Sequence, residues 1–466
     1  MQRNRLFSSL FRVLERRESD LRLFSARCVL RLLSAGRAST VPELQLPKYE
    51  AAVCKVLFQL TKASRNDEAF FEAEAVAPMV ALLEAQTRQL GLGNRSVPLD
   101  APLHLAGALK NLSSTETAQV RLGTLGTVSV LCEVLRACQR EFEDGQEEVV
   151  QLLTHVSGAL RNLSLSKAHH KQLAACGAPQ LLCSLVESHV VHSELMYHAT
   201  RVLAKLSLHE SMRQGINSDS RHVAGLLKLL EAKGSEWSDF DDRSHGSTVA
   251  ALPQATALLV RVAFTLGNLT ASNERNRALI GVQLNGGAAV LRLLGCAHSR
   301  YARQLEGQGK LKEGDASRRE GEGKQCEGKE GEGKESEGKE GEGKAVVAGT
   351  GEEIEELLVK LIRLLANISI SSEVGHLLVS AADLSVLPEL LHLSLRHDRE
   401  EVLLNATSAV TNLSFYTCRP SQLFALAQPL CTALLDVLLH PNEEAVAEAA
   451  RAFGNFSRDS EVRAQM

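Results

Sequence analysis

Apolar residues recur along the chain at helical spacing. In one such run, Leu105, Ala106, Leu109 and Leu112 lie three or four positions apart, which places them on one face of a helix. A comparable run covers 150–163, and short polar or Gly/Pro-containing breaks separate such runs from one another. The pattern therefore predicts a long series of helices.

Each long apolar run ends in a five-residue box of the form Leu-x-Asn-Leu-Ser, which closes the helix before its Ser or Thr leaves it. Six clear copies place the central residue at Asn111, Asn162, Asn268, Asn367, Asn412 and Asn455. Two weaker copies carry Lys205 and Gln59 in that place. Self-similarity on this scale is typical of solenoid proteins, in which each repeat buries its apolar face only against its neighbours.

Two further helices accompany each box. A helix introduced by Gly or Pro precedes it, as at 177–186 and 286–294, and a short helix follows it, as at 273–280, where Ser272 or Asn273 is available as the N-cap. Asn412 lies 45 residues after Asn367 and Asn455 lies 43 residues after Asn412, so the basal repeat is about 43 to 45 residues long. The predicted unit is therefore a repeat of three helices.

Longer intervals between boxes require insertions, and all of them fall between the second and third helices. These insertions cover 86–99, 139–146, 234–254 and 304–350. The last one is rich in Glu, Gly and Lys, cannot build an apolar core, and is predicted to be disordered. Its match to a phosphate-binding loop at 328–334 is interpreted as chance, because Glu335 stands where that loop needs Ser or Thr.

This order of helices resembles the armadillo repeat over nearly the whole chain. The resemblance implies an all-α fold, a right-handed armadillo-type α-solenoid (superhelix) with a disordered charged insertion. Armadillo repeats are expected over 1–303, where the first are degenerate, and over 351–466, with 304–350 as the insertion. In this family the box Asn faces a concave groove, where its amide bonds the extended backbone of a partner. The alternative is that these side chains only hold neighbouring repeats together.

Composition narrows the function to protein binding. The 466 residues are 44% hydrophobic and only 4% aromatic, and the net charge of −4 gives no general attraction to nucleic acid or membranes. No apolar run reaches the length of a membrane span. The ten cysteines form no C-x-x-C pair and are interpreted as small buried residues of a reducing compartment.

No catalytic motif is present, so the sequence favours a protein that is not an enzyme and needs no cofactor or small-molecule substrate. The combination of Cys183, His189, His192 and His198 is a weak candidate for a metal site. His169 and His170 are predicted to form a solvated turn. The Arg-rich start, 1–36, is interpreted as an incoming repeat or cap, with a mitochondrial presequence as the alternative.

Residues four and seven places before each box Asn lie on the same helix face as that Asn, so they are predicted to line the groove. Several are basic, so the middle and C-terminal groove is expected to suit an acidic, extended or phosphorylated protein segment, unless the cations pair with neighbours such as Glu355 and Glu356. Gly107 and Gly158 are expected to leave the groove without a side-chain wall.

Trp237, the only Trp, is predicted to lie in a loop at the rim, whereas armadillo proteins that import nuclear-localisation signals carry Trp in the groove. The candidate partner-binding residues are Asn111, Asn162, Arg201, Lys205, Arg261, Phe264, Asn268, Lys360, Arg363, Asn367, Asn412, Arg451 and Asn455.

A closer resemblance covers the second half. The stretches 259–271, 361–368, 405–416 and 453–459, with the long charged insertion, resemble a subfamily of armadillo proteins associated with the assembly of cilia and flagella. That resemblance implies an adaptor between axonemal components, radial spokes in particular, and intraflagellar transport, located in the cytoplasm and the cilium or flagellum. A general armadillo adaptor in signalling or nuclear transport is the alternative. The last residues, 461–466, start another repeat, so a truncated chain with exposed apolar surface at this end is expected.

Overall fold

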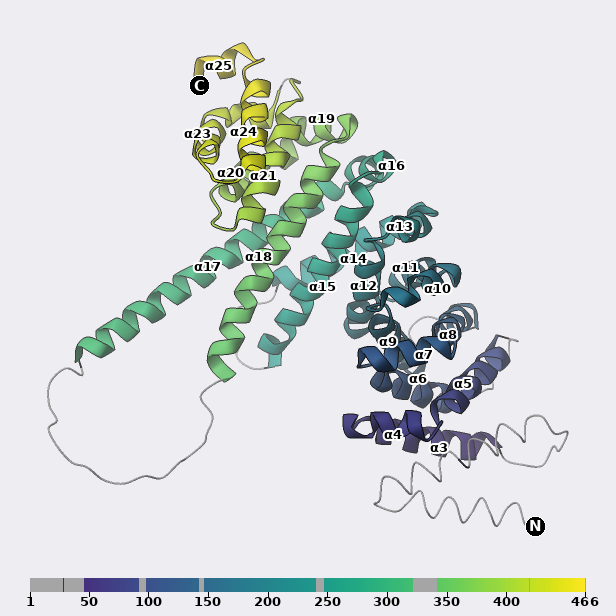
Figure 1. Ribbon diagram of the computed structural model, residues 1–466. Coiled ribbons are helices and arrows are strands. Elements are labelled where there is room, and N and C mark those ends of the chain that lie inside the picture. Colours follow the sequence, from purple (N-terminus) through teal and green to yellow (C-terminus); the bar gives the residue numbers. More distant parts are fainter. Residues whose placement is uncertain are drawn as a thin grey trace, which may run out of the picture. The chain divides into compact units, whose positions relative to one another are not determined.

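The computed structural model describes residue 28 and residues 46–91, 98–141, 146–239, 247–321, 342–418 and 420–465. Every regular element within these ranges is a helix (Figure 1). The chain divides into two compact units, Met1–Leu226 and Leu227–Met466, called unit 1 and unit 2 below. Apart from Cys28, the predicted N-terminal repeat or cap over 1–36 lies outside the described residues.

Unit 1 repeats the predicted three-helix motif. The first helix of unit 1 whose bounds are described is a third-type helix, α3 (Leu46–Thr61), which ends in the weak box around Gln59. The first helices of its repeats are η1 (Ser64–Asn66) with α4 (Asp67–Glu72), then α7 (Glu116–Thr124), then η2 (Lys167–His169) with α10 (His170–Ala175), and α13 (Glu210–Asn217). The second helices are α5 (Val76–Leu90), α8 (Thr127–Glu141) and α11 (Ala178–Ser188). The third helices are α6 (Asp100–Leu112), α9 (Glu147–Leu163) and α12 (Ser193–Leu206).

Unit 2 follows the same plan. The boundary between the units falls within α14 (Ser220–Asp239), a second-type helix. The first helices of unit 2 are α16 (Glu274–Ala278) with η3 (Leu279–Gln283), α19 (Ser372–Ser380) with η4 (Ala382–Leu384), α22 (Gln422–Ala425) and α25 (Ser460–Gln465). The second helices are α17 (Gly286–Gly321), α20 (Leu387–Leu395) and α23 (Ala427–Leu438). The third helices are α15 (Ser247–Thr270), α18 (Glu342–Ile368), α21 (Glu400–Ser414) and α24 (Glu443–Phe456).

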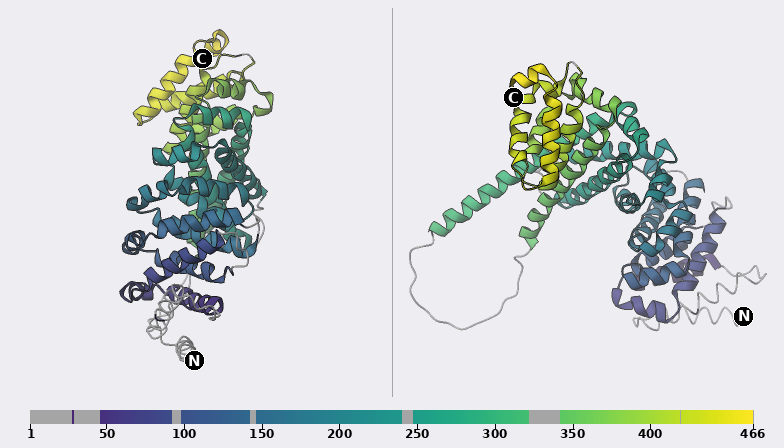
Figure 2. Two further views of the ribbon diagram at one scale, coloured as in Figure 1. Left: turned by 90° about the vertical axis from the view of Figure 1, so that its right-hand side faces the viewer. Right: turned by 45° about the horizontal axis from the view of Figure 1, so that its top comes forward.

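The third helices of each unit pack side by side. In unit 1, α6 lies between α3 and α9, and α9 lies between α6 and α12; in unit 2 the order is α15, α18, α21 and α24 (Figure 2). Their apolar faces close the core against the other helices, and Leu109, Leu160 and Leu365 are fully buried. Each repeat thus buries its apolar face against the next one, which confirms the predicted all-α armadillo-type solenoid.

The insertions lie where the sequence predicts them, between second and third helices. They fall in the connections from α5 to α6, α8 to α9, α14 to α15 and α17 to α18. The last connection holds the charged insertion, and α17 and α18 extend into its two ends. Its central residues, 322–341, lie outside the described residues.

The helix boundaries follow local hydrogen bonding. Asn273 is the N-cap of α16, as predicted, because its side chain accepts a hydrogen bond of 3.0 Å from the Asn276 backbone N–H. Box serines such as Ser113, Ser164 and Ser207 stand at the C-caps of their helices, which confirms that the box closes the third helix.

Two predicted surface features are wrong. Trp237 lies inside α14 rather than in a rim loop, and it is fully buried because its ring packs where α14, α15 and α17 meet. His169 and His170 are buried rather than solvated, since their Nε2 atoms bond the carbonyls of Gln119 and Ser164 at 3.0 Å each. Both histidines thus tie a first helix to the preceding repeat or box.

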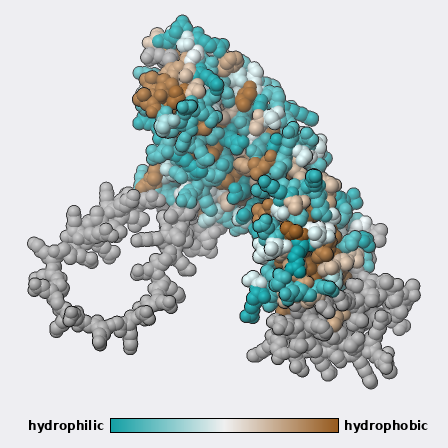
Figure 3. Space-filling model, in the orientation of Figure 1, coloured by the Kyte–Doolittle hydropathy of each residue, from teal (hydrophilic) through white to brown (hydrophobic). Residues whose placement is uncertain are grey.

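Apolar side chains are exposed on α23, near the C-terminal end. Leu435 and Leu439 are 55% and 87% exposed, and Figure 3 shows an apolar patch over α23. Within the described ranges, no single helix is both long and apolar enough to cross a membrane, although three pairs of consecutive helices joined by sharp bends reach that length and composition together. No group of three His, Cys, Asp or Glu side chains among the described residues is arranged to hold a metal ion.

Candidate partner-binding surface

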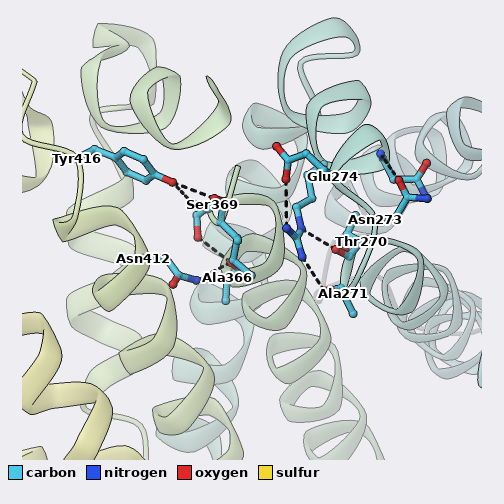
Figure 4. A network of polar contacts seen from close by, with 11 residues as sticks. Thr270, Ala271, Asn273, Glu274, Ala366, Ser369, Asn412 and Tyr416 are labelled. Atoms are coloured by element: carbon cyan, nitrogen blue, oxygen red, sulfur yellow. Dashed lines mark hydrogen bonds and ion pairs between the residues drawn. The ribbon is translucent and has the colours of Figure 1, made fainter. Parts of the chain in front are cut away.

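The box asparagines connect neighbouring repeats. The Asn412 Nδ2 donates a hydrogen bond of 2.9 Å to the backbone carbonyl of Ala366, the residue just before the Asn of the preceding box (Figure 4). Asn367 bonds Gly267 in the same way at 2.8 Å, and Asn455 bonds Thr411 at 3.0 Å. Asn162 repeats this bond to Lys110 in unit 1, at 3.2 Å, and Asn111 bonds the Thr61 hydroxyl at 3.1 Å. The alternative interpretation of these residues, that they hold repeats together, thus describes their observed contacts.

The box Ser or Thr shares the same carbonyl. Ser369 donates to the Ala366 carbonyl at 2.8 Å, so this oxygen accepts one bond from its own box and one from the next repeat. The carbonyls of Lys110, Gly267 and Thr411 are shared in the same way. A backbone carbonyl has two lone pairs, and carbonyls at the end of a helix lack the usual helical partner. The Gly267 carbonyl differs in that it also accepts the Ala271 backbone N–H, at 3.1 Å. The box therefore provides hydrogen-bond donors for the carbonyls at the end of its own helix and also positions the next repeat.

Asn162 is fully engaged within the chain. Its Nδ2 also donates to the Ser113 hydroxyl at 2.9 Å, and its Oδ1 accepts from the Arg161 guanidinium at 2.8 Å. The side chain is only 8% exposed. Asn162 therefore acts in this structure by orienting Arg161.

Replacing Asn412 with Ala is expected to destabilise unit 2 by about 1 kcal/mol, because the bond to the preceding repeat is lost. The measurement is the shift in the denaturant unfolding transition followed by circular dichroism. Asn405→Ala is the matched control, because it makes the same change of residue in α21 while removing a bond only to Glu401 of that helix. Equal shifts for the two variants would contradict the connecting role.

Unit 1 carries unpaired positive charge on the face formed by its third helices. Arg161 and Arg201 are half-buried there, and the charge of Arg201 adds to the effect of burial in lowering the pKa of Arg161. The Arg201 Nη1 donates to the Tyr197 hydroxyl at 2.8 Å, which fixes its direction. None of the cations of this face forms an ion pair with a described residue. We call this set the basic surface; it consists of Lys62, Lys110, Arg161, Arg201 and Lys205.

The prediction that Gly107 and Gly158 leave part of this face without side chains is wrong, because side chains of the preceding repeats cover both glycines. A Cβ on Gly107 would lie 2.6 Å from the Phe58 ring, and one on Gly158 would lie 2.9 Å from the Lys110 side chain. Gly at these places lets a long side chain from the preceding repeat lie across the helix. Phe58 and Lys110 therefore form the wall that the glycines lack.

Two histidines in this region are held neutral. Burial lowers the pKa of His155 to about 4, and the charges of Lys110, His104 and Lys62 act in the same direction. Burial also lowers the pKa of His198 to about 3, together with Lys110 and Arg161. A positively charged imidazole is disfavoured here because the surrounding charge is already positive. At neutral pH the charge of the surface therefore comes from Lys and Arg alone.

A hollow of about 570 Å³ adjoins the basic surface between α9 and α12. Thr154 and His155 line it from α9, and Ser193 and Glu194 from α12. His155 also contacts the Phe58 ring, with the centroids 5.5 Å apart. Glu147 lines the hollow as well, and none of the five cations of the basic surface does.

The predicted groove cations of unit 2 are largely neutralised. Lys360 lies over the Phe264 ring, and its Nζ pairs with the Glu356 carboxylate at 2.6 Å. Glu356 also pairs with Arg399, at 2.8 Å. Burial would raise the pKa of Glu356, but the bonds and charges of Lys360 and Arg399 outweigh it and hold the pKa below its usual value. The alternative prediction of pairing with local acids is therefore correct for Lys360.

The other two arginines predicted on α15 and α24 also face acidic groups. Arg451 forms an ion pair with Glu448. Burial raises the pKa of Glu353 while the charge of Arg261 opposes that rise, so these two side chains interact electrostatically. Arg363 is half-buried and forms no ion pair with a described residue. The C-terminal part of the predicted groove is thus less basic than expected.

Phe58, Lys62, Lys110, Arg161 and Tyr197 were not among the predicted site residues. The signal for two of them lies in the box itself, since Lys110 and Arg161 stand immediately before the box Asn. The four- and seven-residue offsets select only one face of a single helix, whereas these side chains reach the surface from the helix end or from a neighbouring repeat.

The stacked three-helix repeats form an armadillo-type α-solenoid. No protein-family profile matches the chain. Its curated relatives are named armadillo repeat-containing protein 2, which confirms the armadillo resemblance. The Mus musculus protein is 25% identical over 99% of this chain and 46% of its own length. The Bos taurus protein is 23% identical over 99% of this chain and 46% of its own length. The chain thus spans less than half the length of these relatives.

Solved structures with similarity to the chain include engineered proteins. One engineered protein covers 97% of this chain and 98% of its own length, with a TM-score of 0.46 and 17% identity. A computationally designed armadillo repeat protein for modular peptide recognition covers 71% of this chain and 99% of its own, with a TM-score of 0.40 and 17% identity.

Proposed function

We propose that this chain is a non-enzymatic adaptor that binds an extended acidic or phosphorylated segment of a partner protein along the third-helix face of unit 1. The observation that supports this is the basic surface, five cations without an ion-pair partner among the described residues. Holding like charges together is unfavourable unless an anion compensates them, and Arg forms strong charge-assisted bonds to carboxylates and phosphates.

The armadillo arrangement supports an extended ligand. Lys110, Arg161 and Arg201 come from three successive third helices, α6, α9 and α12, so they follow one another along the stack. A segment that crosses these helices meets a new cation in each repeat. Electrostatic complementarity of this kind contributes to specificity and association rate as well as to affinity.

We further propose that the adaptor serves the assembly of cilia or flagella, in the cytoplasm and the cilium or flagellum. Its partners would be axonemal components, radial-spoke proteins in particular, and the intraflagellar-transport machinery. This part rests on the resemblance to the ciliary armadillo subfamily. The basic surface supports only the chemistry of the bound segment.

Affinity capture from ciliated cells tests both parts of the proposal. The 466-residue chain is compared with Arg161→Glu/Arg201→Glu, with Arg261→Glu/Arg363→Glu, and with Arg88→Glu/Arg140→Glu as the control. The control makes the same change of charge on the exposed side of second helices. We expect radial-spoke or intraflagellar-transport subunits to be captured and then lost with the first variant.

Capture of nuclear or junctional proteins without ciliary ones would overturn the ciliary assignment and favour a general adaptor. Retention of all partners by Arg161→Glu/Arg201→Glu would instead refute the proposed surface. Loss with only the Arg261→Glu/Arg363→Glu variant would move the site to unit 2.

A further inference from the structure

The residue that follows the box Ser is an exposed leucine in two neighbouring repeats of unit 1. Leu165 follows Ser164 at the end of α9 and is 58% exposed. Leu208 follows Ser207 at the end of α12 and is 49% exposed. Single exposed apolar residues are common on protein surfaces, but these two recur at the same position of adjacent repeats. We call Leu165 and Leu208 the apolar edge.

The two turns that carry these leucines pack against each other. The His170 Nε2 donates to the carbonyl of Ser164, the residue before Leu165, at 3.0 Å. The His170 ring contacts the ring of His209, the residue after Leu208, with the centroids 4.4 Å apart. Helices that pack side by side have axes about 8 to 10 Å apart, so the two leucines are expected at about that spacing.

Cations of the basic surface adjoin the apolar edge on both helices. Arg161 lies about one helical turn before Leu165 at the end of α9. Lys205 lies nearly one turn before Leu208, and its carbonyl accepts the Leu208 backbone N–H at 3.4 Å. The boxes of α3 and α6 carry polar residues at the same position. The apolar edge thus belongs to the same two helices as both arginines of the basic surface.

Arg213 and Lys167 add positive charge at the same turns. The Arg213 Nη1 donates to the carbonyls of Ser207 and Leu208, at 3.0 and 3.1 Å, which holds the guanidinium against the edge. Lys167 begins η2, two residues after Leu165. Neither cation forms an ion pair with a described residue. The apolar edge is therefore accompanied by several cations without ion-pair partners in the described part of the chain.

We propose, on the basis of the function proposed above, that the apolar edge binds apolar side chains of the same acidic segment that lies along the basic surface. The partner motif would be one apolar residue followed by two acidic residues, repeated along an extended segment. Charge complementarity selects an acidic segment: the two turns, 164–170 and 207–213, contain a single acid, Glu210, which forms no ion pair with a described residue.

The spacing of the motif follows from backbone geometry. A polyproline II segment has three residues per turn and rises about 3.1 Å per residue, so residues three positions apart lie on one side, about 9 Å from each other. This distance matches the spacing of helices that pack side by side. Apolar residues three positions apart would therefore reach both leucines of the apolar edge. The acidic residues between them would turn toward the cations of the basic surface.

The same box position is also apolar in unit 2, where the surroundings differ. Ile370 and Phe415 follow the boxes of α18 and α21 and are 46% and 57% exposed. The Arg458 guanidinium lies 5.0 Å from the centroid of the Phe415 ring, so this cation already contacts an aromatic ring of the chain. Ile370 and Phe415 therefore provide a matched control for the apolar edge.

Fluorescence anisotropy with two labelled ten-residue peptides separates apolar contact from charge. The first consists of Leu-Asp-Asp three times followed by Leu, and the second has Ser in place of each Leu. Asp is used because it disfavours a helix. We expect the Leu peptide to bind the 466-residue chain about tenfold more tightly, because the burial of apolar surface adds to the attraction between charges.

In the variant Leu165→Ser/Leu208→Ser, this advantage of the Leu peptide should disappear, while binding of the Ser peptide stays unchanged. Both leucines are about half-exposed, so the variant is expected to fold, which circular dichroism checks. The control, Ile370→Ser/Phe415→Ser, makes a comparable change at the same box position of unit 2 and should keep the advantage. A third peptide of the same composition, with its leucines gathered at one end, should bind like the Ser peptide.

The outcomes distinguish this inference from the function on which it rests. Equal binding of the Leu and Ser peptides, or an advantage that survives Leu165→Ser/Leu208→Ser, would overturn the apolar edge and leave the acidic binding intact. Loss of the advantage with only the unit 2 control would also overturn it. An unchanged advantage for the third peptide would refute the spaced motif. Failure of all three peptides to bind, even at low salt, would refute the proposed function and this inference together.

Discussion

Replacing Trp237 with Ala is expected to lower the free energy of unfolding of unit 2 by about 3 to 5 kcal/mol. The ring is fully buried, and its Nε1 donates to the Thr256 hydroxyl at 2.8 Å. The Arg300 guanidinium lies 4.6 Å from the ring centroid and donates to the Trp237 carbonyl. The substitution would therefore leave both a cavity and a buried guanidinium without its ring.

The measurement is denaturant unfolding followed by circular dichroism, because this substitution removes the only Trp of the chain. Trp237→Phe is the matched control. It keeps an aromatic ring and loses the hydrogen bond, so we expect a smaller cost of about 1 to 2 kcal/mol. Leu439→Ala, at a side chain that is 87% exposed, should change the transition little. A loss for Trp237→Ala no larger than for Leu439→Ala would contradict the packing role.

Reversing two charges of the basic surface, with Arg161→Glu/Arg201→Glu, is expected to weaken the binding of an acidic peptide by about a hundredfold or more. Each substitution removes a donor group and adds a repelling carboxylate. The probe is a fluorescent ten-residue peptide of Glu and phosphoserine, titrated against the chain and followed by anisotropy. Arg88→Glu/Arg140→Glu has the same net charge and should bind almost as well as the unchanged chain.

Salt and pH provide further checks on this binding. Affinity should fall as ionic strength rises, because the cations are partly exposed. Affinity should not rise as the pH falls from 8 to about 6.5, since the pKa of His155 and that of His198 lie well below this range and both rings are already neutral. It should fall slightly instead, because the phosphoserines of the probe, with a second pKa of about 6, lose some negative charge. A steep gain in affinity on lowering the pH from 8 to 6.5 would show that a histidine carries the charge instead.

The three-helix repeat and the place of the insertions follow from the sequence, because both depend on spacing along the chain. The box alone shows where each third helix ends, and Asn273 marks the start of α16. The same local rules fail for Trp237, whose burial depends on Thr256 and Arg300 in later helices.

The candidate site was predicted less completely. The offsets from the box locate Arg201 and Lys360 on third helices, but they do not show which cations meet an acid. Lys360 is neutralised by Glu356 one turn away, whereas Arg201 bonds a tyrosine hydroxyl instead. The wall made by Phe58 and Lys110 depends on side chains that cross from one repeat to the next, so it has no signature within a single repeat.

Lys205 gives one repeat junction of unit 1 a distinct character. At this junction, between α9 and α12, Lys stands where the six clear boxes place Asn. The Arg161 carbonyl accepts the Ser164 hydroxyl bond of its own box, and Arg161 and Arg201 repel each other nearby. An anion bound by both arginines would offset the repulsion between them and connect the two helices through its hydrogen bonds. The junction would then act as a hinge that stiffens when the partner is bound, and hydrogen exchange in α12 should slow accordingly.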